Sequence, residues 1–188
     1  MFRLFGLGRK SRTFEFRCSD CGSIHRGSPS FSLHRPEHMF DVPEEERAQR
    51  VMATDDFCII SPAEVDVDGD TTYWIRATLD VPVHGVDEPF CWGLWVSQSK
   101  DAFERYRETY DEDQSGGVSF GWLPVHMKHY RNADDSWPML ECDVRWGEPG
   151  KRPKLSLWEC ENQLYTDQRD GISWDQAIAI AAPLLHGS

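Results

Sequence analysis

The sequence predicts an α+β fold: a mostly antiparallel sheet of about six strands, with helices packed on it and a small N-terminal lobe like a zinc knuckle. Three observations support this prediction. Segments with an apolar residue at every second position recur through the middle of the chain. Residues 99–110 and 174–185 show helical spacing behind a capping residue. A Cys-x-x-Cys-Gly motif at residues 18–22 is typical of metal knuckles.

The segment Phe90–Ser97 is the predicted centre of the sheet. Its residues are apolar at both the even and the odd positions, so both faces should be covered and both edges paired with other strands. Gly93 stands between Trp92 and Trp95, where a missing side chain favours close approach by another element. The two sets of side chains are Phe90, Trp92, Leu94 and Val96 on one face, and Cys91, Gly93 and Trp95 on the other.

The N-terminal half alternates short strands with one helix. Pro43 and the three glutamates after it open a helix over 43–53, because proline suits the first turn and the helix dipole favours acidic residues there. Asp68-Gly69 between alternating segments predicts a hairpin turn. A calcium loop would need a glutamate at its twelfth position, which is Ala77. We expect strands over 14–17, 57–60 and 73–83, and a loop over 29–43.

The C-terminal half supplies two clear helices and three strands. Ser99 is the N-cap of a helix over 99–110 whose aromatic residues share one stripe. Ser173 and Gln176 form a capping box that opens the last helix, over 174–185. His126 and His129 have no cysteine or acid at matching spacing and are interpreted as packing or surface residues. The expected strands are 118–124, 139–146 and 153–160.

Length and composition predict one domain. A chain of 188 residues can bury roughly 70% of its unfolded surface without disulfides or a metal. We expect a flexible tail over 1–13 and a single α+β domain over 14–188, of which 14–35 form the knuckle lobe. No run approaches the roughly 20 apolar residues of a membrane span. The first ten residues contain no apolar run long enough for a secretory signal. We therefore expect a cytoplasmic protein with six reduced cysteines.

The net charge is unevenly distributed. The formal charge is -12, yet residues 1–35 carry seven Lys or Arg against two Asp or Glu. The rest of the chain therefore carries -17. Such a body argues against binding DNA or an anionic membrane and favours a basic protein partner through electrostatic steering. The basic head is interpreted as a solvated segment, with nucleic-acid contact through the knuckle as a weaker alternative.

Cys18 and Cys21 are the strongest chemical signal. Two intervening residues let both sulfurs reach one ion, and Gly22 permits a turn whose amides point at a thiolate. His25 could supply a third ligand. A structural zinc site is the leading interpretation; unliganded thiols, a redox pair and a catalytic zinc with an open position are the alternatives.

The fourth zinc ligand is open among Cys58, His34 and His38. Cys58 is favoured, because thiolate is the better zinc donor and the two histidines fall in the predicted loop.

An enzyme is the second functional hypothesis. Arg76 and Glu159 are charged residues on strands that should carry core, so we expect a pocket beside Arg76, Trp95 and Glu159. Arg76 could hold an anionic group by two hydrogen bonds, and Glu159 could act as a general base. Glu141 and Asp143 could act as a pair of carboxylates in acid and base catalysis. The simpler interpretation is that both are solvated on a polar strand face beside Arg145. No phosphate loop, nucleophile elbow or zinc-protease motif occurs.

A set of motifs spread over residues 14–180 resembles one bacterial family. They are Cys18-x-x-Cys21-Gly22 with His25, Asp56-Phe-Cys58, Ile75-Arg76 leading to Val81-Pro82, Trp92-Gly-Leu-Trp-Val-Ser97-x-Ser99, Gly121-Trp-Leu123, Tyr130, Arg152-Pro153 with Glu159, and Gln168 before Gly171-Ile172. In this order they are similar to the family known as domain of unknown function 2199. The chain has Asn162-Gln163-Leu164 where the family pattern has His-Pro-Leu.

The resemblance implies a small bacterial cytoplasmic protein and no particular activity. Its pattern also carries Cys18, Cys21, His25 and Cys58 together, which supports grouping them as metal ligands. The leading prediction is therefore a non-enzymatic binding or interaction module with a structural zinc site. The alternative is a small enzyme with its pocket near Arg76.

Overall fold

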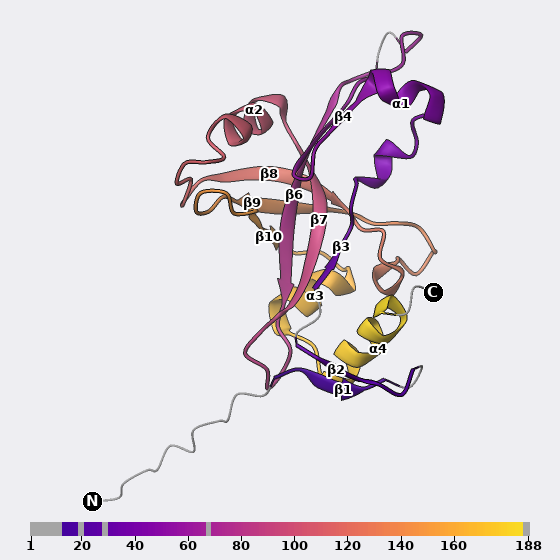
Figure 1. Cartoon of the computed structure of the whole chain (residues 1–188), viewed down its shortest axis with the longest axis vertical. Helices are drawn as coiled ribbons and strands as arrows, with labels where there is room; N and C mark the ends of the chain where they lie inside the picture. Colours follow the sequence, from indigo (N-terminus) through magenta and orange to yellow (C-terminus); the bar gives the residue numbers. More distant parts are fainter. Residues whose placement is uncertain (1–12, 19–20, 28–29, 67–68, 186–188) are drawn as a thin grey trace, which may run out of the picture.

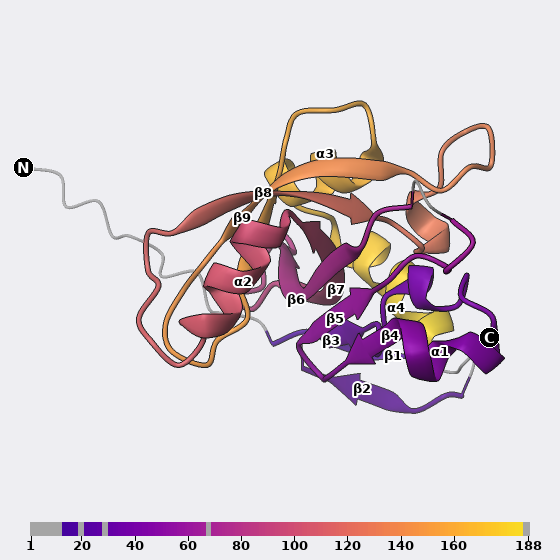
Figure 2. The ribbon, with the colours of Figure 1, turned by 90° about the horizontal axis from the view of Figure 1, so that it is seen from above.

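The computed structural model describes residues 13–18, 21–27, 30–66 and 69–185. An eight-stranded mixed sheet forms the body of the molecule (Figure 1 and Figure 2). Its path runs β3-β7-β6-β10-β9-β8, and β5 pairs with β6 and with β4. The strands are β3 (Ser30–Ser32), β4 (Val51–Ala53), β5 (Phe57–Ile60), β6 (Thr72–Val81), β7 (Phe90–Gln98), β8 (Val118–Pro124), β9 (Met139–Arg145) and β10 (Lys154–Leu157).

Strand β7 lies inside the sheet, which confirms the prediction for Phe90–Ser97. It pairs antiparallel with β6, where Val96 faces Ile75, and parallel with β3. The side chains of Trp92 and Trp95 are 4% and 2% exposed. Trp92 packs in the larger hydrophobic core and Trp95 in a smaller one on the other side of the sheet. A Cβ added at Gly93 would strike the hydroxyl of Ser32, so β3 is the element that approaches closely there.

The prediction of about six mostly antiparallel strands is wrong in number, and the sheet is mixed. The sheet has eight strands, and the β3–β7 and β10–β6 pairs are parallel. β3 lies in the predicted loop because its one apolar residue, Phe31, gives no alternating pattern. β4 lies in the predicted helix over 43–53: the helix ends at Arg50, and Val51 is already extended, with φ -117°.

In the described residues, four α-helices complete the fold: α1 (Glu44–Arg50), α2 (Lys100–Glu108), α3 (Gln163–Asp170) and α4 (Trp174–Leu185). Two short 3-10 helices, η1 (Glu37–Met39) and η2 (Lys128–Tyr130), lie in the connections. Ser99 caps α2 by accepting from the Ala102 amide, and Ser173 and Gln176 form the predicted capping box. The predicted elements did not include α3, which begins where the Asn162 side chain accepts from the Leu164 amide. None of the helices in the described part is long and apolar enough to cross a membrane.

Strands β8 and β9 cross over the end of β6 and β7 in Figure 1, so the sheet folds partly back on itself. The crossing is close because Gly121 has no side chain: a Cβ there would lie 2.6 Å from Cγ2 of Val96. Two side chains at the end of β7 contact the main chain of β8. Gln98 Nε2 donates to the Phe120 carbonyl at 3.1 Å, and Ser97 Oγ accepts from the Trp122 amide at 3.2 Å.

The N-terminal lobe is a two-stranded hairpin of β1 (Glu15–Arg17) and β2 (Ile24–Arg26), which lies beside α4 (Figure 1). Phe14 and Phe16 are buried in the larger core. The Phe14 ring packs on Trp174, the first residue of α4, with 4.9 Å between ring centroids. The lobe is therefore joined to the body by aromatic contacts. Residues 1–12 of the predicted tail and Asp68 of the predicted turn lie outside the described residues.

Candidate functional site

The knuckle of the N-terminal hairpin brings Cys18, Cys21 and His25 together. The two sulfurs and one ring nitrogen all lie within 4.8 Å of one another. Cys18 directly follows β1, and His25 is the middle residue of β2, where it pairs with Phe16. The hairpin register therefore returns the histidine to the cysteines. Three nitrogen and sulfur donors at this separation fit the donor set that zinc prefers.

The backbone of the knuckle is arranged to hold a thiolate. Gly22 has φ +70°, a conformation that favours glycine, and its amide donates to the Cys18 carbonyl at 3.0 Å. The Ser23 amide donates to Sγ of Cys21 at 3.4 Å, and Nε2 of His25 lies 3.5 Å from the same sulfur. The hydrogen bonds from Ser23 and His25 lower the pKa of Cys21 to about 6. The predicted orientation of amides toward sulfur is present.

Cys58, the favoured fourth ligand, lies outside this cluster. It is a fully buried residue of β5 in the smaller core, with Trp74 and Trp95. Burial raises the pKa of its thiol to about 11, which disfavours the thiolate that binds metal. The other two candidates are also elsewhere: His34 is exposed, and His38 stacks on Trp74 with 4.6 Å between centroids. In the described residues the cluster has three protein donors.

Arg76 and Trp95, two of the predicted pocket residues, face each other across β6 and β7. Both are buried. The Arg76 guanidinium donates to the Ser32 hydroxyl at 2.5 Å and to the Asp55 carbonyl at 3.3 Å, and Trp95 Nε1 donates to the Leu33 carbonyl at 3.0 Å. These contacts anchor β3 and the β4–β5 turn to the sheet. Both side chains have structural partners.

Glu159 is exposed and lies in the bend after β10. The cavities of about 850, 590 and 260 Å³ in the described part are lined by neither Arg76 nor Glu159. These three cavities therefore do not join the two residues, and a shared pocket stays a prediction.

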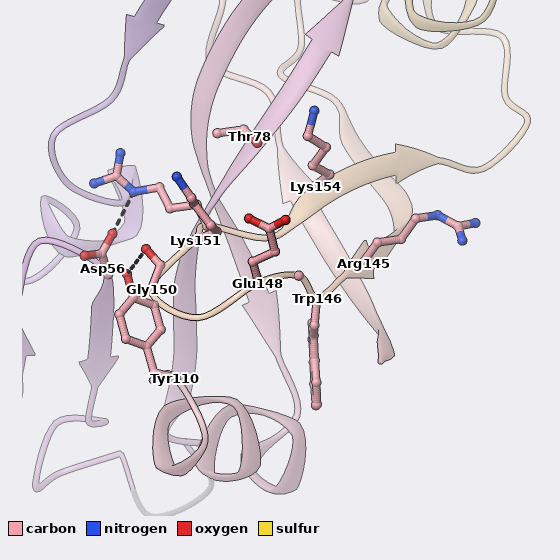
Figure 3. A pocket seen from close by; sticks show the side chains of 11 residues that line it. Asp56, Thr78, Tyr110, Arg145, Trp146, Glu148, Gly150, Lys151 and Lys154 are labelled. Carbon is pink, nitrogen blue, oxygen red and sulfur yellow. Dashed lines mark hydrogen bonds and ion pairs between the residues drawn. The ribbon is translucent and has the colours of Figure 1, made fainter. Parts of the chain in front are cut away.

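The cavity of about 850 Å³ lies between β10, the turn before it and the end of α2 (Figure 3). Its charged groups are mostly paired. Arg152 Nε lies 2.7 Å from Asp56 Oδ1, and Lys154 Nζ lies 2.5 Å from Asp80 Oδ2. Figure 3 shows the Arg145 side chain pointing away from Asp56. The lining residues are Asp56, Thr78, Tyr110, Arg145, Trp146, Gly147, Glu148, Gly150, Lys151, Arg152 and Lys154.

The lining of this cavity supplies carboxylates from Asp56 and Glu148, cationic groups from the basic residues, and the hydroxyl of Thr78. No cysteine, serine or histidine lines it. Burial raises the pKa of Tyr110, which keeps its hydroxyl neutral. The cavity could not be predicted from the sequence, because Asp56 and Arg152 meet only in the folded chain. The available signal was the basic run Lys151-Arg152 after the Gly-Glu-Pro-Gly turn.

The cavity of about 590 Å³ is largely apolar and lies between β3, β7 and α4. His126 and His129 both line it, beside Trp92 and Leu184. Neither histidine belongs to a metal-binding group in the described residues. His126 is partly buried, and His129 is exposed.

Comparisons with known proteins identify a family for the chain. Residues 17–172 match a family model described as an uncharacterized protein conserved in bacteria (DUF2199). The matched range includes the cluster of Cys18, Cys21 and His25 and all strands from β2 to β10. No curated protein and no solved structure matches the chain.

Proposed function

We propose that this chain, which belongs to the family of uncharacterized proteins conserved in bacteria (DUF2199), is a binding module whose N-terminal lobe is fixed by a structural zinc ion. The observation that carries the metal assignment is the approach of Cys18, Cys21 and His25 to within 4.8 Å. The Ser23 amide supports the assignment because it donates to the sulfur of Cys21.

A structural role fits the size of the lobe. β1 and β2 have three residues each, and an isolated hairpin of that length is marginal in water. A metal ion bridging the end of β1 to the middle of β2 would close the hairpin at its turn. Phe14 and Phe16 would then be held in the core. The fourth position of a tetrahedral site falls to water or to a donor outside the three.

Elemental analysis of the purified full chain tests the metal assignment. We expect about one zinc per chain, as a single tetrahedral site requires. Cys21→Ser and His25→Gln should lose it; both side chains lie outside the core, so the fold should survive. Circular dichroism checks this.

Cys58→Ser is the matched control for the metal test. It removes a buried thiol from another part of the sheet and should retain the zinc. Loss of zinc in Cys58→Ser alone would contradict the assignment, and so would a chain that is purified without zinc and does not take it up.

The partner we propose is a basic protein. The chain carries -12 formal charges, and the part after residue 35 carries -17. A surface of this sign attracts a cationic partner and repels nucleic acid and anionic lipid. Arg76 and Glu159, the candidate reactive pair of the enzyme hypothesis, line none of the three cavities described above.

Titration with a defined basic peptide tests the partner class. The acetylated and amidated peptide Lys-Gly-Lys-Gly-Lys should bind the full chain, and the same peptide with glutamine at each lysine should bind far more weakly. Affinity should fall steeply between 50 and 500 mM salt, because screening shortens the reach of surface charge. Equal affinity for both peptides, or binding that ignores salt, would contradict a charge-steered basic partner.

A further inference from the structure

We infer that the outer face of β8, β9 and β10 binds a lysine or arginine side chain of the partner, at Glu141 between the indoles of Trp122 and Trp158. The inference rests on the proposed basic partner and adds where and how it is held. Four residues define this site, here called the aromatic-acid face: Phe120, Trp122, Glu141 and Trp158.

Strand register places the four side chains on one face. Glu141 of β9 is directly opposite Trp122 of β8, and Asp143 is opposite Phe120. On the other side of β9, the Trp158 amide donates to the Glu141 carbonyl at 2.9 Å, which continues the β10 register. Directly opposed residues project to the same side of a sheet. Glu141 therefore has an indole on each flank.

The aromatic rings of this face are open to solvent. Phe120, Trp122 and Trp158 are 40%, 42% and 45% exposed, and Val118 and Met139 extend the apolar area. The Phe120 ring touches both indoles, with centroid distances of 5.5 Å to Trp122 and 5.1 Å to Trp158. Contiguous exposed aromatics of this kind mark interaction surfaces. Strands that pack both faces would not carry three such rings outward.

Glu141 is the unpaired charge of the face. Asp143, the other carboxylate on β9, accepts from Trp158 Nε1 at 2.9 Å and forms an ion pair with Arg145 at 2.9 Å. The Glu141 carboxylate makes no hydrogen bond or ion pair with any described residue, and it is exposed. A carboxylate flanked by indole faces suits a cation, since the ring quadrupole and the acid attract the same charge.

An extended basic segment satisfies these groups better than the alternatives. An anion would meet an unpaired carboxylate, and an apolar ligand would leave that carboxylate desolvated. A second copy of this chain, docked through the same face, would bring two acidic bodies together with no cation between them. A lysine or arginine stem can lie along the rings while its charged end reaches Glu141.

The test uses the Lys-Gly-Lys-Gly-Lys peptide and the full chain, followed by the indole N–H signals of Trp122 and Trp158 in NMR spectra. Both signals should shift on titration. Glu141→Gln and Trp122→Ala should each weaken binding about twofold to fivefold, because each removes one of two attractive groups in the site. Glu45→Gln removes the same charge from exposed α1 and should leave affinity unchanged. All three substituted side chains are exposed, and melting curves confirm that the variants fold.

The outcomes separate this inference from the proposed function. Salt-sensitive binding that is equal in wild type, Glu141→Gln and Trp122→Ala would overturn the site and leave the basic partner standing. No peptide binding at all would overturn both. Sedimentation that shows a dimer in wild type and a monomer in Trp122→Ala would mean that a second copy covers the face, which also overturns the inference.

Discussion

Phe14 and Trp174 pack ring against ring, with 4.9 Å between centroids, and so join the N-terminal hairpin to the start of the last helix. The two residues come from opposite ends of the chain, and Phe14 is only 1% exposed. The lobe therefore depends on the body for its position, and its contribution to stability is measurable in the global unfolding reaction.

Replacing Phe14 should destabilise the whole protein. Phe14→Ala should lower the free energy of unfolding by about 3 kcal/mol, through lost burial and the cavity left on Trp174. Urea denaturation followed by tryptophan fluorescence measures the change. Phe40→Ala is the control, since Phe40 is 54% exposed and should cost less than about 1 kcal/mol. A similar loss in both variants would show that the hairpin does not contribute through this contact.

Removing the proposed zinc should loosen the lobe and spare the sheet. After treatment with a strong chelator, amides of residues 15–17 and 24–26 should exchange with deuterium much faster, because a short hairpin loses the metal that bridges its two strands. Amides of β6 and β7 should keep their protection, since both strands are paired along their length. Unchanged exchange in the hairpin would argue against a structural metal.

Gly121 should not tolerate a side chain. Gly121→Ala places a Cβ 2.6 Å from Val96 Cγ2 and 2.8 Å from the Ser97 carbonyl oxygen, and the backbone atom cannot move aside without shifting β7. We expect a loss of about 2 kcal/mol, read as a lower denaturation midpoint. Gly147→Ala, with open space around its Cβ, should stay within about 0.5 kcal/mol of wild type. Equal effects would mean that the strand crossing is looser than described.

Stability should fall at alkaline pH because of Cys142. Burial raises the pKa of its thiol from 9.0 to about 12, and the thiol donates to the Gly121 carbonyl at 3.4 Å. The unfolded chain loses this proton from about pH 9 upward while the folded chain keeps it, so stability is full below pH 9 and declines as pH rises toward 12. The loss near pH 10.5 should be about 2 kcal/mol.

Cys142→Ala isolates this contribution, because tyrosines also titrate in the same range. The variant starts less stable but should lose less between pH 8 and pH 10.5 than wild type does. The measurement is the urea midpoint at the two pH values. Parallel curves for the two proteins would assign the alkaline loss to other groups.

Alternating hydrophobicity was enough to predict most of the sheet. Phe90–Ser97 is apolar on both faces and proved to be covered on both, with partners at each edge. The strands over 57–60, 118–124 and 139–146 were predicted for the same reason and are present. Short strands were missed: β3 has one apolar residue, and β4 directly continues a helix. Their pairing depends on neighbours that are distant in sequence, such as β7 for β3.

The candidate sites divide in a similar way. The spacing of Cys18 and Cys21 and the glycine after them fix a local turn, so three metal donors could be predicted from the sequence. Cys58 could not be placed, because its distance from the knuckle depends on the tertiary fold. The aromatic-acid face could not be predicted, because aromatic residues at alternate positions of a strand normally face the core. Phe120 and Trp122 instead face solvent in the structure.

The side chains of Ser97 and Gln98 occupy part of the main chain of β8, the strand that carries Phe120 and Trp122. β8 is the last strand on the path of the sheet, and an exposed, aromatic last strand is the usual template for fibril growth. Here the Phe120 carbonyl and the Trp122 amide are already engaged by β7, so an incoming chain would find fewer open main-chain groups to pair with. The aromatic side chains of β8 can therefore stay exposed to solvent without making the strand a template for aggregation.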